Sequence, residues 1–319
     1  MADRRVTLED IRDAARGIDG VAVRTPLQPL PELTAEVGVP VALKLENLQP
    51  TGAFKLRGAW TLIRRLDPSA RARGVVTYSS GNHGQAVAFV AERMGVRAVI
   101  VMPETAPPRK VEGVERWGGE VILAGTTSED RYAKAMAFAE SDGLTVMPPY
   151  DHPDIIAGQG TVGLEILEDL PGVAHVAVPV GGGGLLAGIA TAVHALKPGT
   201  RVTGVEPEGG AALNAALAAG APVRLERTHS LADGLLPLSV GRITFSHMRG
   251  IVDAVTVTDR AIAQATVWLH RVAGVLAEPS GAATTAALRS RAFVPAGPIV
   301  LVVSGGNMDP ATIETLADT

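Results

Sequence analysis

The chain has 319 residues, 46% of them hydrophobic, which is enough for a large core that we expect to be divided between two lobes. A formal net charge of −4 gives no sign of a nucleic-acid surface, and the lack of cysteine excludes disulfides, thiolate metal sites and a cysteine nucleophile. The charged residues 1–18 do not resemble a signal peptide, and no apolar run approaches membrane-spanning length. We therefore expect a cytoplasmic protein that binds neither nucleic acid nor a membrane.

Short apolar runs alternate with segments of helical period along the chain. The strand-like runs occupy residues 41–46, 75–78, 98–102, 120–124, 144–147, 175–180, 201–206, 254–258 and 299–303. Helical segments lie between them, including 59–66, 83–95, 161–170, 185–196 and 211–219. This alternation predicts an α/β protein built from βαβ units with mostly parallel strands.

Proline-rich stretches predict where the chain crosses between lobes. One lies at residues 148–153 and another near Pro40 and Pro50. We expect a small domain of residues 50–147, inserted into a large domain formed by residues 1–49 and 148–319. The chain ends soon after Ser304, so we expect no C-terminal regulatory domain.

The glycine-bounded turn at residues 52–58 contains Lys55, between a strand-like run and a helix-like run. An enclosed lysine amine has a lowered pKa because burial disfavours its charged form, and it can then form a Schiff base. The alternative is a solvent-exposed lysine at the start of a helix, which is the usual environment of this residue type.

The small and polar residues 79–84 follow the run at 75–78 and precede a helical segment. Glycine N–H groups and a helix N-terminus favour an anion such as a carboxylate. Asn82 could supply an amide to a phenolic or carbonyl oxygen, and Ser80 a hydroxyl. An ordinary helix cap by Ser80 or Asn82 is the simpler interpretation.

Four consecutive glycines, residues 181–184, end a strand-like run and open a helical segment. Successive backbone N–H groups in such a turn can bind a phosphate. Gly182, Gly184 and Ala187 also satisfy a dinucleotide-binding fingerprint, with Glu206 near the distance of a ribose-binding acid, so a nicotinamide-dependent oxidoreductase stays open. Close packing of helix on strand is the purely structural alternative.

Ser304 follows the apolar run at 299–303, where its hydroxyl could donate to a ring nitrogen or cap a helix. Among the seven histidines, His83 stands in a candidate site. His152, with Asp151 and Asp154, lacks the spacing of a standard metal site.

Taken together, these turns resemble the fold type II pyridoxal-phosphate enzymes (tryptophan synthase β-like), in the branch of serine/threonine dehydratase and serine racemase. The likeness runs from Thr25 to Asp309, and its motifs occur in the order GAFKLRGA, SSGNHGQA, AGQGT, PVGGGGLLAGIA, GVEPEG, ADG, EPSGA and SGGN. It implies two open, twisted, mostly parallel sheets flanked by helices, with a small domain inserted in a large one. It also implies a homodimer, on analogy alone.

The resemblance implies a role for each turn. Lys55 would carry the Schiff base with pyridoxal 5'-phosphate and move the α-proton. Cofactor contacts would come from Phe54 on the ring, Asn82 on the ring hydroxyl, Gly181, Gly182, Gly183 and Gly184 on the phosphate, and Ser304 on the pyridine nitrogen. The substrate would contact Ser79, Ser80, Asn82 and His83.

The resemblance implies β-elimination from a β-hydroxy amino acid such as L-threonine or L-serine, giving a 2-oxo acid and ammonia. A serine facing the pyridine nitrogen favours this reaction over transamination. Ser80 would be a second acid/base and indicates a serine racemase as the alternative, because dehydratases of the threonine type commonly have alanine there. A non-catalytic protein that binds a phosphate ligand is another alternative.

Two departures from the racemase pattern leave the metal and the substrate open. Glu206 could hold a divalent cation, Mg or Ca, but Ala212 stands where a second carboxylate is expected. Glu129 stands where animal racemases have a substrate-facing arginine. Substrates such as 3-hydroxyaspartate or an aryl serine therefore stay possible.

Overall fold

Two separate sheets divide the chain in the computed structural model, which describes residues 4–79 and 81–317. The larger sheet has six strands in the order β1-β2-β10-β7-β8-β9, and the smaller has four in the order β5-β4-β3-β6. The six are β1 (Leu27–Pro29), β2 (Val41–Leu45), β7 (His175–Pro179), β8 (Arg201–Pro207), β9 (Asp253–Val257) and β10 (Ile299–Val303). The four are β3 (Val75–Thr77), β4 (Ala98–Met102), β5 (Glu120–Leu123) and β6 (Thr145–Val146).

Strand pairing is parallel in both sheets except at the edge strand β1, which is antiparallel to β2. β10 is buried on both faces, as expected for a central strand of a parallel sheet. Val300 and Val302 pack into one core and Leu301 into another, because successive side chains point to opposite faces. The apolar run at 299–303 therefore supplies both cores.

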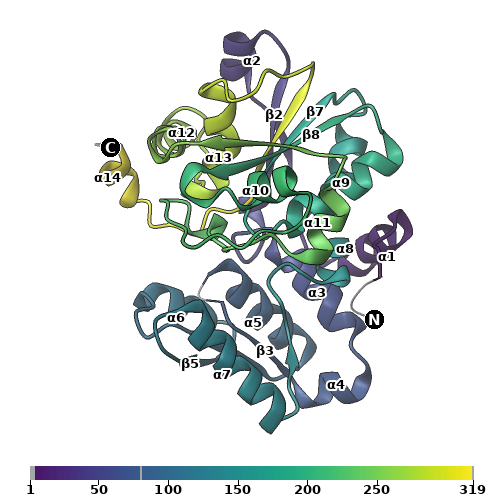
Figure 1. Cartoon of the computed structure of the whole chain (residues 1–319), viewed down its shortest axis with the longest axis vertical. Helices are drawn as coiled ribbons and strands as arrows, with labels where there is room; N and C mark the ends of the chain where they lie inside the picture. The colour runs from purple at the N-terminus through teal and green to yellow at the C-terminus, as the bar shows by residue number, and fades with distance from the viewer. Residues whose placement is uncertain (1–3, 80, 318–319) are drawn as a thin grey trace.

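Helices cover both faces of the large sheet and surround the small one (Figure 1). The large lobe contains α1 (Leu8–Ile18), α2 (Pro31–Val37), α8 (Pro153–Asp169), α9 (Gly184–Leu196), α10 (Ala212–Ala219), α11 (Arg242–Met248), α12 (Asp259–Arg271), α13 (Pro279–Arg289) and α14 (Thr312–Ala317). The small lobe contains α3 (Lys55–Arg65), α4 (Pro68–Arg73), α5 (Asn82–Met94), α6 (Pro108–Glu115) and α7 (Ser128–Ser141). The described residues also form the short 3-10 helices η1 (Glu46–Leu48), η2 (Glu208–Gly210) and η3 (Asp233–Leu235).

The α/β fold with two mostly parallel sheets is confirmed, but two helix boundaries differ from the sequence prediction. α8 begins at Pro153 rather than at 161, because proline is tolerated at the first helical position and His152 Nδ1 accepts from the Asp154 N–H at 3.1 Å. α3 begins at Lys55 rather than at 59. The candidate lysine is therefore the first residue of a helix and not part of a free turn.

Every strand of the four-stranded sheet lies within residues 50–147, and α3 packs on α8 of the large lobe (Figure 1). The limits of the inserted domain stay a prediction. Among the described helices, none is long and apolar enough to cross a membrane.

Candidate active site

A cavity of about 910 Å³ is lined by residues of both lobes. The carboxyl ends of β3, β7 and β10 supply three of its walls, as is usual for ligand sites of parallel sheets. The predicted residues that line it are Phe54, Lys55, Ser79, Asn82, His83, Gly181, Gly182, Gly183, Gly184 and Ser304. The structure thus brings these four distant turns together, whereas Ser80 lies outside the described residues.

Lys55 is held by a loop that is bonded to the end of β10. Gly52 has φ +70°, a conformation that favours glycine, and its carbonyl accepts from the Gly306 N–H at 2.9 Å. The Phe54 N–H donates to the Ser304 carbonyl at 3.1 Å. Lys55 Nζ donates to the Pro149 carbonyl at 2.7 Å, and burial lowers the pKa of the Lys55 amine to about 8.

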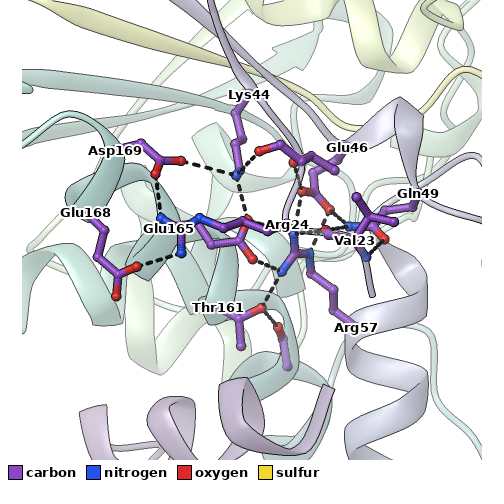
Figure 2. Close-up of polar contacts among 12 residues, drawn as sticks. Val23, Arg24, Lys44, Glu46, Gln49, Arg57, Thr161, Glu165, Glu168 and Asp169 are labelled. Atoms are coloured by element: carbon purple, nitrogen blue, oxygen red, sulfur yellow. Dashed lines mark hydrogen bonds and ion pairs between the residues drawn. The ribbon is translucent and has the colours of Figure 1, made fainter. Parts of the chain in front are cut away.

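A buried ion network anchors the first turn of α3 through Arg57 (Figure 2). The Arg57 guanidinium donates to both carboxylate oxygens of Glu46 at 2.8 Å. It also donates to Glu165 of α8 at 2.6 and 3.0 Å, and Lys44 Nζ reaches Glu165 at 2.5 Å. The network fixes the helix that begins with Lys55 against η1, β2 and α8.

This network was not predicted from the sequence. Lys44 interrupts the apolar run at 41–45, and Arg57 stands in the lysine-containing turn, yet the side chains of both are fully buried. A charge inside an apolar strand is rarely buried unless it is paired. Lys44 inside an apolar run was therefore the feature of the sequence from which a buried ion pair could have been predicted.

The glycine loop leaves no room for side chains. A Cβ on Gly182 would lie 2.2 Å from the Tyr150 ring, and Gly183 has φ +92°. The loop ends at the N-terminus of α9, where backbone N–H groups are available and no side chain caps the helix. This is a cradle for an anion, and it fits the phosphate of pyridoxal 5'-phosphate.

Asn82 is held by hydrogen bonds from two directions. Its Nδ2 donates to Glu278 Oε1 at 2.7 Å, and its Oδ1 accepts from Asn307 Nδ2 at 2.8 Å. Glu278 also lines the cavity, and burial together with nearby Asp233 raises the pKa of its carboxyl to about 7. No role was predicted for Glu278, although it stands in the EPSGA motif.

His83 lines the cavity with a neutral side chain. Burial, and to a smaller extent the nearby Lys55, lowers the pKa of its imidazole to about 3. Its Nε2 lies 3.0 Å from the Met147 carbonyl and donates to it. The imidazole therefore supplies no positive charge to a carboxylate. If His83 binds substrate as predicted, the contact would come from its backbone N–H in the first turn of α5.

Glu206 has a structural role at the start of a helix. Its two carboxylate oxygens accept from the N–H groups of Leu213 and Asn214 at 2.6 and 2.9 Å, in the first turn of α10. Within residues 4–79 and 81–317, no cluster of three or more His, Asp or Glu side chains is placed to hold a metal ion. The carboxylate caps a helix, so the structure gives the metal prediction no support.

Arg131 of α7 lines the cavity. It lies two positions after Glu129, the residue that stands where animal racemases have a substrate-facing arginine. Glu129 lines the cavity as well, and its carboxylate forms an ion pair with Arg224 of the other lobe.

Comparison with known proteins agrees with this geometry. Residues 18–305 match the family described as pyridoxal-phosphate dependent enzyme. An L-threonine ammonia-lyase of Thermotoga maritima is 41% identical over 312 residues, which cover 98% of this chain and 78% of that protein. Two solved structures are similar. Maize serine racemase has a TM-score of 0.93 and 36% identity, and the match covers 99% of this chain and 98% of that one. The threonine deaminase of T.th. has a TM-score of 0.90 and 41% identity, and the match covers 95% of this chain and 99% of that one. With its half-buried lysine and anion cradle on one cavity, the chain belongs to the pyridoxal-phosphate dependent enzymes.

Proposed function

We propose that the protein is a pyridoxal-phosphate-dependent ammonia-lyase. It converts a β-hydroxy amino acid, such as L-threonine or L-serine, to a 2-oxo acid and ammonia. The observation that carries the proposal is the placement of the Lys55 amine, the glycine loop and Ser304 around one cavity. The 41% identity to an L-threonine ammonia-lyase over nearly the whole chain supports this substrate class.

The residues of the cavity would hold the cofactor and move one proton. Bound pyridoxal phosphate supplies an electron sink that stabilises negative charge at the substrate Cα. The N–H groups of residues 181–184 would bind its phosphate, and the Ser304 hydroxyl would hydrogen-bond its ring nitrogen. Phe54 would pack on the ring, and the Asn82 amide would donate to the ring hydroxyl.

The Lys55 amine would remove the α-proton as a general base. With a pKa of about 8, roughly a tenth of this amine is uncharged at pH 7. At the ordinary lysine pKa of about 10.4 the fraction would be under about 0.1%. Burial therefore prepares the amine for proton transfer near neutral pH.

A panel of L- and D-3-hydroxy amino acids, including threonine, serine and 3-hydroxyaspartate, tests the reaction. Release of 2-oxo acid and exchange of the α-proton should be measured separately. We expect equal amounts of 2-oxo acid and ammonia from L-threonine or L-serine, with little formation of the enantiomer. Fast enantiomer formation with little 2-oxo acid would reject the lyase in favour of a racemase, the second candidate, which the similarity to maize serine racemase favours.

The glycine loop gives a second prediction. Gly182→Ala should weaken the binding of pyridoxal phosphate at least tenfold, because the added Cβ meets the Tyr150 ring and displaces the N–H groups that face the phosphate. Fluorescence titration of the apoenzyme measures the dissociation constant. Gly199→Ala is the control, since an added Cβ there has nothing within 4 Å. Unchanged affinity in Gly182→Ala would contradict the assignment of the phosphate site.

A homodimer in the cytoplasm belongs to the proposal as well. The dimer is supported by the family resemblance alone. Sedimentation equilibrium of the purified protein tests the dimer.

A further inference from the structure

Glu278 joins three segments of the chain at the wall of the cavity. It stands at the N-cap of α13, is 8% exposed and accepts from Asn82 Nδ2 of α5 at 2.7 Å. On the other side of Asn82, Asn307 Nδ2 donates to Asn82 Oδ1 at 2.8 Å and to the Thr51 carbonyl at 2.7 Å. The chain of contacts thus runs from α13 through α5 to the loop that precedes Lys55.

These contacts permit one orientation of the Asn82 amide. A flipped amide would place its oxygen against the Glu278 carboxylate and its NH₂ group against the NH₂ group of Asn307. Two hydrogen bonds, one of them to a charged acceptor, would become repulsive contacts in a buried place. An ionised Glu278 is an acceptor only, so it distinguishes the two ends of the amide.

We propose that Glu278 is a positioning residue that fixes the Asn82 amide with its N–H donor, and not its carbonyl, available to the ligand in the cavity. The inference rests on the proposed function, because the ligand concerned is the cofactor. An amide NH₂ has two hydrogens, and Glu278 uses one of them. The second is left for an oxygen acceptor such as the ring hydroxyl.

The charged surroundings of Glu278 support a role that depends on its ionisation. Burial raises the pKa of the Glu278 carboxyl most, and the negative charge of Asp233 in η3 raises it further. The hydrogen bond from Asn82 and the positive charge of Lys110 in α6 lower it. Lys110 and Asp233 form an ion pair at 2.7 Å between the lobes, and the neutral His83 and the Lys55 amine line the same cavity. A protonated Glu278 can also donate to a flipped amide, so acidification below about pH 7 weakens its selection of one orientation, while the contact from Asn307 remains.

Spectra of the holoenzyme test the inference in the variant Glu278→Gln. Glutamine can donate or accept, so it no longer distinguishes the two ends of the Asn82 amide. We expect a changed position or intensity ratio of the cofactor's visible and near-ultraviolet bands, cofactor affinity reduced at least threefold, and loss of any wild-type change in these bands near pH 7. We also expect kcat to fall at least tenfold. Glu208→Gln, at an exposed glutamate of η2, is the matched control.

A double-mutant cycle separates positioning from general stabilisation. If Glu278 acts through Asn82, adding Glu278→Gln to Asn82→Ala should change the spectra and affinity no further. Additive effects, or unchanged spectra in Glu278→Gln, would overturn the inference. If Glu278→Gln does not fold, Asn307→Ala removes the opposite anchor of Asn82 and should produce the same spectral change. Unchanged spectra in Asn307→Ala would then overturn the inference. A wild-type protein that binds no pyridoxal phosphate would reject the proposed function itself.

Discussion

Lys55→Ala is expected to lower kcat for 2-oxo acid release by about 10³-fold or more, because it removes the amine that is proposed both to bind the cofactor and to act as the general base. Borohydride reduction of the wild-type holoenzyme should add the mass of the reduced cofactor to the peptide that contains Lys55. The same treatment of the variant should leave that peptide unmodified. Spectrophotometric assay of 2-oxo acid and mass spectrometry measure the two effects.

The controls for this prediction separate chemistry from folding. Lys134→Ala removes an exposed lysine of α7 and should retain wild-type turnover. A small primary amine added to Lys55→Ala should restore part of the activity, since the cavity is large enough to admit it. Full turnover in Lys55→Ala would show that another group carries the reaction and would reject the proposed mechanism.

Arg57→Met is expected to lower the free energy of unfolding by about 3–5 kcal/mol, because it leaves the Glu46 carboxylate buried without its cationic partner. The carboxylate of Glu165 keeps Lys44 but loses two hydrogen bonds from the guanidinium. Denaturant unfolding of the apoenzyme, followed by circular dichroism, measures the change.

Arg24 provides the comparison for Arg57 within the same region of Figure 2. Its side chain is 51% exposed and pairs with Glu168 and Asp169, so Arg24→Met should change the free energy of unfolding by less than about 1 kcal/mol. A similarly small loss in Arg57→Met would show that the buried network contributes little. A large loss that also weakens cofactor binding would indicate that the network holds the Lys55 end of α3.

The parts of the fold that depend on local pattern could be predicted from the sequence. The strands β4 and β10 have the bounds expected from their uninterrupted apolar runs. The start of α8 could not be placed, because Pro153 is compatible both with a loop and with the first position of a helix. Length and apolar content alone do not decide between the two.

The candidate site was predictable where glycines and a lysine mark turns at the ends of strands. The residues that support those turns were missed. Tyr150 and Glu278 reach the cavity only after distant segments pack together, and neither has a local pattern that distinguishes it from a loop tyrosine or a helix-capping acid. The capping role of Glu206 was missed for the same reason, because the helix that its carboxylate caps comes into place only in the fold.

The place of β10 in the large sheet has a consequence for how the enzyme matures during synthesis. This strand follows all the others of the sheet in sequence but lies between β2 and β7, so the sheet keeps an open central slot until residues 299–303 leave the ribosome. Contacts between partners so far apart in sequence form slowly. A nascent chain that stops before residue 299 thus lacks both the middle of its sheet and the proposed cofactor contact at Ser304.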